Sequence, residues 1–88
     1  MTRVIHKKIW PEFFEKVLSG EKRFELRVAD LEISTGDTLV LEEWNPKTKM
    51  YTGRSLTKTA DYILKSSLDQ FGQHDLIEKH GLYVITLE

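Results

Sequence analysis

Residues 19–30, with the sequence Ser-Gly-Glu-Lys-Arg-Phe-Glu-Leu-Arg-Val-Ala-Asp, constrain the fold of this chain most strongly. Gly20 marks the end of a short helix, because glycine readily adopts the left-handed conformation that follows a last helical turn. The residues after it alternate between apolar and charged, which predicts a half-buried strand. The apolar side chains would face the core: Phe24, Leu26 and Val28. The charged side chains would form a row on the opposite face: Arg23, Glu25 and Arg27.

An amphipathic helix is predicted immediately before this strand. Pro11 suits the first turn of a helix, where its missing N–H leaves no hydrogen bond unmade. An apolar stripe follows it, made of Phe13, Phe14, Val17 and Leu18. Because so short a helix is not stable alone, the stripe must pack into the core.

Further strands are predicted before and after the hairpin-like sequence of residues 45–49. They cover residues 3–9, residues 38–44 and a return strand from about residue 50 to 64 with a bulge at Gly53. Residues 82–87 are apolar on both faces and predict a central strand. Residues 69–71 predict a helical turn, and residues 75–80 predict a short helix that ends at Gly81. The expected fold is therefore α+β: a small mixed, mainly antiparallel β-barrel with an N-terminal helix and a second short helix late in the chain.

Length and composition favour a single domain, residues 1–88, in a reducing compartment. The chain has no cysteine, and no apolar run approaches the roughly 18 residues of a membrane-spanning helix. A cytoplasmic protein with no membrane partner is therefore expected. The net charge of −1 argues against broad electrostatic binding to nucleic acid. Residues 47–65 nevertheless carry five bases and one acid, so one face of the protein would be positive.

The order of several short motifs resembles a known family. These motifs are Ile5-His6-Lys7-Lys8, Phe14-x-x-Val17-x-Ser19-Gly20, Gly20-x-Lys22-x-x-Glu25-x-Arg27, Gly36-Asp37-x-Leu39-x-Leu41-x-Glu43-Trp44 and Tyr51-Thr52-Gly53-Arg54. The set is similar to the ASCH branch of PUA-like domains, and most similar to the small phage and prokaryotic family catalogued as DUF3850. The resemblance implies a PUA-like pseudobarrel in which the early helix and the following strand border a cleft for a nucleobase or nucleotide.

The candidate site follows from this resemblance and from the charges of the motif. Lys22, Glu25 and Arg27 would give the cleft two cations and one acceptor, and an arginine fork suits a phosphate or a guanine edge. Thr52 and Arg54 would be rim contacts, and Trp10, Tyr51 or Trp44 would provide a stacking plane if one of them reaches the cleft. A structural role is the stronger expectation for the aromatic residues, with Trp10 in the core or as a staple beside the helix, whereas Trp44 suits either role. The ligand would be RNA, a nucleotide or a nucleoside with a modified base. A plain structural explanation stays open, in which the charged row is a solvated strand face and Gly53 marks an ordinary bulge.

Two other functions are compatible with the sequence. Some ASCH proteins are amidohydrolases that deacylate an N4-acylated cytidine with a lysine, a threonine three residues later and a downstream glutamate. Here Lys22 matches the lysine, but Glu25 stands in place of the threonine. As catalytic residues, Glu25 would act as a general base on water, and Lys22 or Arg27 would stabilise the oxyanion. The third option is a protein-interaction accessory module, because a fold does not fix a function.

No cofactor or metal ion is expected. His6, His74 and His80 share no metal-ligand spacing, and the chain has neither a P-loop nor a dinucleotide fingerprint. The sequence leaves the oligomeric state open.

Overall fold

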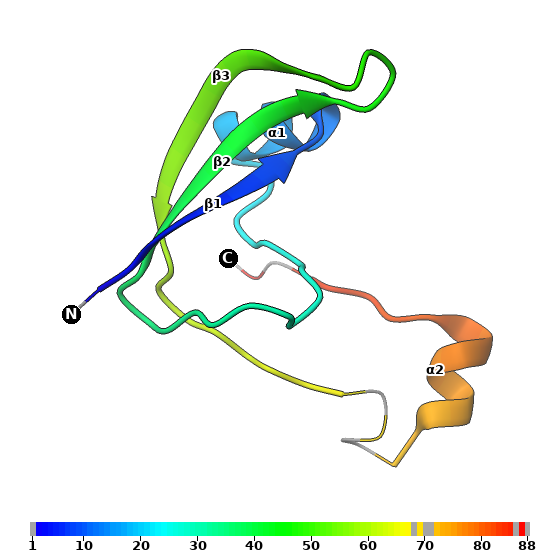
Figure 1. The fold of residues 1–88 in the computed structure, drawn as a ribbon. Helices are drawn as coiled ribbons and strands as arrows, with labels where there is room; N and C mark the ends of the chain where they lie inside the picture. The colour runs from blue at the N-terminus through cyan, green and yellow to red at the C-terminus, as the bar shows by residue number, and fades with distance from the viewer. Residues whose placement is uncertain (1, 68, 70–71, 86, 88) are drawn as a thin grey trace.

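The computed structural model describes residues 2–67, 69, 72–85 and 87, and contains one sheet and two helices (Figure 1). The elements in chain order are β1 (Val4–Ile9), α1 (Pro11–Leu18), β2 (Thr38–Asn45), β3 (Met50–Thr59) and α2 (His74–His80). The strands lie in the order β1-β2-β3, so β2 is central. The protein is therefore a small α+β structure.

The sheet is mixed. β2 and β3 form an antiparallel hairpin in which Trp44 pairs with Tyr51 and Asn45 with Met50. β1 is parallel to β2, with Val4 opposite Thr38. A parallel pair needs a long crossover connection, which here consists of α1 and residues 19–37.

The two faces of the sheet differ because side chains alternate along each strand. One face packs against α1 and forms the core from Ile9, Phe14, Val17, Leu39 and Leu41. The opposite surface, here called the outer face, carries Val4, His6 and Lys8 of β1 and Val40, Glu42 and Trp44 of β2. Its side chains are exposed or half-buried, and Figure 1 shows α1 on one side of the sheet only.

A buried carboxylate joins the ends of the three strands. Asp37 accepts hydrogen bonds from the backbone N–H groups of Arg3 (2.9 Å) and Ser34 (2.8 Å), and its carbonyl accepts from the N–H of Ala60 (2.8 Å). These hydrogen bonds hold the pKa of Asp37 below its usual range, since they favour the ionised form. The turn that precedes β2 is thus fixed to the start of β1 and to the end of β3.

The predicted strand at residues 22–28 is wrong: this segment is irregular and lies outside the sheet. Side chains occupy backbone carbonyls that a strand ladder would use. Lys22 donates to the carbonyl of Phe24 at 2.8 Å, and Arg23 donates to the carbonyl of Gly20 at 3.3 Å. The expectation that the apolar side chains of this segment face the core is also wrong for two of them, because Leu26 is 72% and Val28 80% exposed, whereas Phe24 is half-buried.

The predicted central strand at residues 82–87 is also not observed. Residues 82–85 and 87 have no regular structure, and Tyr83 is 93% exposed; Thr86 lies outside the described residues. An apolar run of this kind needs a cover on both faces, and the described part of the chain provides no neighbouring strand. Within the described residues the sheet is accordingly open, and the expected closed barrel is not seen.

Of the apolar stripe expected to pack into the core, Phe14 and Val17 are buried, whereas Phe13 and Leu18 are 44% and 53% exposed. Several local predictions are confirmed. Gly20 follows α1 with a φ of 85°, and the predicted bulge at Gly53 is present with a φ of 94°. The late helix begins one residue before the expected start and ends at Gly81. β3 ends at Thr59, short of the predicted end. Of the helical turn expected at residues 69–71, residues 70 and 71 lie outside the described chain.

Neither helix in the described ranges is long and apolar enough to cross a membrane.

Candidate functional site

An open groove with a volume of about 600 Å³ lies between α1, the end of β1 and the segment of residues 21–27. Its apolar wall consists of Ile9, Trp10, Phe13, Phe24 and Leu26, and its charged residues are Lys8, Lys16, Glu21, Lys22, Glu25 and Arg27. The three residues that the sequence singled out most strongly therefore line one groove.

The end of α1 positions this segment. Gly20 reverses the chain, and the N–H of Lys22 donates to the carbonyl of Lys16 at 3.0 Å, so the segment turns back beside the helix. Its far end is held to the sheet, because the guanidinium of Arg27 donates to the carbonyl of Lys8. The segment is thus fixed at both ends without being a strand.

Glu25 is the centre of a charged cluster in the groove. One carboxylate oxygen accepts from the ammonium of Lys22 at 2.9 Å, and the other accepts from Nε of Arg27 at 2.6 Å. All three side chains are half-buried. Two cations and one anion leave the cluster with one excess positive charge, which favours an anionic ligand.

The groove also has an aromatic wall. The rings of Trp10 and Phe13 are stacked with centroids 6.3 Å apart, and these residues remain 47% and 44% exposed. Near the opposite end of α1, Lys16 and Glu21 form an ion pair of 2.7 Å, which raises the pKa of Lys16. Exposed aromatic surface therefore lies beside charged groups.

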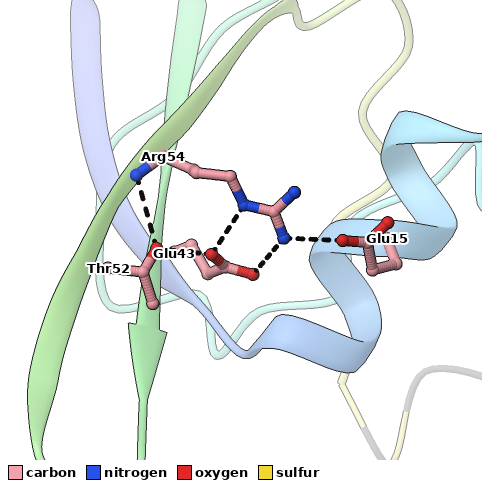
Figure 2. A network of polar contacts seen from close by, with 4 residues as sticks. All are labelled: Glu15, Glu43, Thr52 and Arg54. Atoms are coloured by element: carbon pink, nitrogen blue, oxygen red, sulfur yellow. Dashed lines mark hydrogen bonds and ion pairs between the residues drawn. The ribbon is translucent and has the colours of Figure 1, made fainter.

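A second cluster lies between α1 and the inner face of the sheet (Figure 2). Glu43 is only 3% exposed, and Arg54 binds it with two hydrogen bonds of 2.9 and 2.8 Å. The hydroxyl of Thr52 also donates to Glu43, and Arg54 reaches Glu15 of α1 at 2.6 Å. The hydrogen bonds from Arg54 and then Thr52 hold the pKa of Glu43 below its usual range. The pKa of Arg54 is raised, chiefly by Glu43.

Thr52 and Arg54, predicted as rim contacts, do not line the groove. The bulge at Gly53 turns both side chains toward Glu43, and the guanidinium of Arg54 also lies 4.5 Å from the centroid of Phe14. Trp44, one of the three candidate stacking residues, lies on the outer face with the ammonium of Lys8 4.4 Å from its ring centroid. The six predicted residues thus occupy three places, of which one is the groove.

Sequence reasoning missed Glu43 as the partner of Arg54. The signal was present, because Glu43 continues the alternation of Leu39 and Leu41 and so falls on the buried face of β2. An acid at such a position predicts a buried cationic partner, since carboxylates are almost never fully buried unless paired.

The histidines include one small cluster with acids. The possible ligand atoms of His74, Asp75 and Glu78 lie within 4.8 Å of one another on α2. Asp75 and Glu78 are exposed and His74 is half-buried. His74 Nδ1 lies 3.6 Å from Asp75 and 4.0 Å from Glu78, which are ordinary contacts between polar side chains on a helix surface.

The fold and the groove define a small α+β protein with an open mixed sheet and a charged, aromatic-lined groove beside its first helix. Residues 5–76 match the family described as "Domain of unknown function (DUF3850)", and the chain belongs to this family. The matched range contains the groove and the Glu43 cluster. The family match confirms the resemblance to DUF3850 that the motifs indicated.

The chain is also similar to an uncharacterized 12.9 kDa protein in the GpA 3′ region of Escherichia phage P2. The two are 38% identical over 56 residues, which are 64% of this chain and 50% of the phage protein. The chain thus spans about half the length of that relative.

Proposed function

We propose that this protein is a nucleotide-binding domain of the PUA-like, ASCH type, and that its groove receives a nucleobase or nucleotide, free or within RNA. One observation carries the proposal: the charged cluster of Lys22, Glu25 and Arg27 and the exposed ring of Trp10 line the same groove. This combination matches the two parts of a nucleotide, an anionic phosphate and a flat base.

The size and composition of the groove support a small ligand. Its volume of about 600 Å³ lies within the range of roughly 300–1,000 Å³ that is usual for ligand pockets. Trp10 and Phe13 offer a plane on which a base can stack, and such stacking typically contributes about 1–3 kcal/mol per base.

The charged cluster supports recognition of both phosphate and base. Arg27 and Lys22 are oriented by Glu25, so a phosphate would meet cations that are already positioned. Glu25 can in turn accept from an exocyclic amine of a base. Because the whole chain has a net charge of −1, binding would depend on these local groups rather than on the overall field of the protein.

The hydrolytic alternative has weaker support. Each oxygen of Glu25 accepts a hydrogen bond from a cation, and these two cations stabilise the carboxylate form, which makes Glu25 a weaker base for taking a proton from water. The three groups would need to rearrange before Glu25 could act as a general base.

Calorimetric titration with the four ribonucleoside monophosphates at low salt tests the proposal. We expect saturable binding of at least one nucleotide, which Lys22→Met weakens about tenfold because a charge-assisted hydrogen bond is lost. Trp10→Leu should weaken it similarly by removing the stacking plane. The matched control is Lys79→Met, which removes the same charge from α2, outside the groove.

Two outcomes would contradict the proposal. One is the absence of binding for all four nucleotides at millimolar concentration. The other is an equal loss of nucleotide affinity in Lys22→Met and Lys79→Met, which would mean that binding depends on the net charge of the protein and not on the groove. In a parallel experiment the protein is incubated with N4-acetylcytidine and the acetyl group is followed by NMR. If the protein removes this group catalytically and Glu25→Gln abolishes the removal, the function is hydrolysis and not binding alone.

A further inference from the structure

We propose that the ligand is a single-stranded nucleic acid of several nucleotides, and that a second base of this strand stacks on Trp44 and Tyr51 at the outer face. This inference rests on the proposed function of the groove and extends it from one nucleotide to a strand. Lys8 connects the two places.

Trp44 and Tyr51 form an aromatic pair on a surface that α1 leaves uncovered. They are direct partners in the antiparallel register of β2 and β3, so their side chains project from the same face and are neighbours. Tyr51 is 54% exposed, and Trp44 is half-buried. Two adjacent aromatic residues on an open sheet face suit the stacking of a base.

Lys8 belongs to both places. The residue borders the groove, where its backbone carbonyl accepts from Arg27, whereas its side chain lies on the outer face, with the ammonium 4.4 Å from the ring centroid of Trp44 and 5.7 Å from that of Tyr51. In the part of the chain that the structure describes, it has no carboxylate partner. A lysine side chain is long and flexible, so its ammonium can move from the ring to a phosphate and leave the ring to a base.

The charges around the aromatic pair also favour a polyanion. The hairpin loop that joins β2 to β3 carries Lys47 and Lys49 and no acid, and Figure 1 shows this loop projecting beyond the end of β1. Both lysines lie within a few residues of Trp44 and Tyr51 along the hairpin, so the loop adds positive charge close to the aromatic pair in sequence. The acid on this face of β2 is Glu42, which is the register partner of Lys8 and lies 3.6 Å from His6.

The composition of the outer face argues against a protein as the occupant. Polar and charged residues are interleaved with its apolar ones, as with Lys8 beside Trp44 and His6 opposite Val40. The buried centre of a protein–protein interface is usually depleted of charge. Single-stranded nucleic acid, by contrast, is bound by positive side chains that contact its phosphates and by aromatic side chains on which its bases stack.

The test compares cytidine monophosphate with cytidine oligonucleotides of two, four and six residues. We expect the affinity of the wild-type protein to rise about tenfold between the mononucleotide and the tetranucleotide. Trp44→Leu should remove this gain but change mononucleotide affinity less than twofold. Lys8→Gln should also reduce the gain without removing a large side chain, so the test survives if Trp44→Leu does not fold. Because Lys8 borders the groove, the gain in this variant is measured against its own mononucleotide affinity.

The matched control is Tyr62→Leu, which removes another exposed aromatic side chain that is neither in the groove nor on the outer face. It should leave the length dependence unchanged. This inference is overturned if the protein binds the mononucleotide but its affinity does not rise with oligonucleotide length. It is also overturned if the rise in affinity persists in both Trp44→Leu and Lys8→Gln. Either result leaves the proposed function intact. The absence of binding to mononucleotide and oligonucleotides alike overturns both.

Discussion

Glu43 shows how a single buried acid can organise the contact between α1 and the sheet. Its carboxylate accepts from Arg54 and Thr52 of β3, and Arg54 continues to Glu15 of α1. Such a buried ion pair adds little stability over an apolar alternative, but removing one partner leaves an uncompensated charge. We therefore expect the network to determine the orientation of α1 on the sheet more than the free energy of its packing.

Glu43→Gln tests this role through pH. The folded pKa of Glu43 lies below its ordinary value of 4.5, so the acid contributes stability that is present above that value and lost as the pH falls through the folded pKa. We expect Glu43→Gln to lower the free energy of unfolding at pH 7 by about 2 kcal/mol and to make stability less dependent on pH between 6 and 3. Urea unfolding at a series of pH values measures both effects.

Some acid sensitivity should remain in this variant, because the pKa of Asp37 is lowered in the same direction. Glu78→Gln on the surface of α2 is the matched control and should retain the wild-type slope. If Glu43→Gln and Glu78→Gln have the same stability profile, the Glu43 network is not formed in solution.

Among the elements, those with local signals could be predicted from the sequence. Pro11 and Gly20 delimit α1, Gly81 ends α2, and the turn residues between β2 and β3 indicate the hairpin. Each of these signals acts within a few residues, through the backbone conformations that proline and glycine favour.

The remaining features depend on contacts that are distant in sequence. Residues 23–28 do alternate in polarity, but this segment is held by hydrogen bonds from the side chains of Lys22 and Arg27 to backbone carbonyls and not by a strand ladder. Nothing local encodes the parallel pairing of Val4 with Thr38. The groove cluster was easier to predict than the positions of Thr52, Arg54 and Trp44, because its three residues share one short segment.

The bulge in β3 gives a prediction at the scale of the element. Gly53 has a φ of 94°, and a Cβ built there would meet nothing within 4 Å, so any cost of a side chain is backbone strain alone. We expect Gly53→Ala to lower the free energy of unfolding by about 1–2 kcal/mol and Gly53→Asn by less, since asparagine tolerates left-handed conformations. Chemical denaturation measures both, with Ser55→Ala on the same strand as the control.

A stabilising effect of Gly53→Ala would contradict this geometry. Replacing glycine by alanine stabilises a protein where the native conformation is accessible to both residues, because it reduces the entropy of the unfolded chain.

At the scale of the whole molecule, the structured core is concentrated in β1, α1 and the hairpin. The apolar residues after α2 stand outside this core, with Tyr83 93% exposed. Their sequence predicts a central strand, so the sequence pattern and the structure lead to opposite expectations for a substitution there.

Tyr83→Ser distinguishes the two expectations. The structure predicts a change of less than about 0.5 kcal/mol in the free energy of unfolding, because an exposed side chain loses no packing. Leu41→Ala, at the centre of the core, should cost about 2–5 kcal/mol and serves as the reference. A loss above 1 kcal/mol for Tyr83→Ser in thermal or urea unfolding would mean that this residue is packed in a sheet in solution.

The parallel pairing of β1 with β2 has a consequence for the entropy of chain closure. Val4 and Thr38 are 34 positions apart, whereas Asn45 and Met50 in the hairpin are 5 apart. By the scaling of loop closure with length, joining β1 to β2 costs about 1.7 kcal/mol more than closing the hairpin. Groove residues 10–27 lie inside the longer loop, so the part of the chain proposed to bind a ligand belongs to the closure that costs more chain entropy of the two.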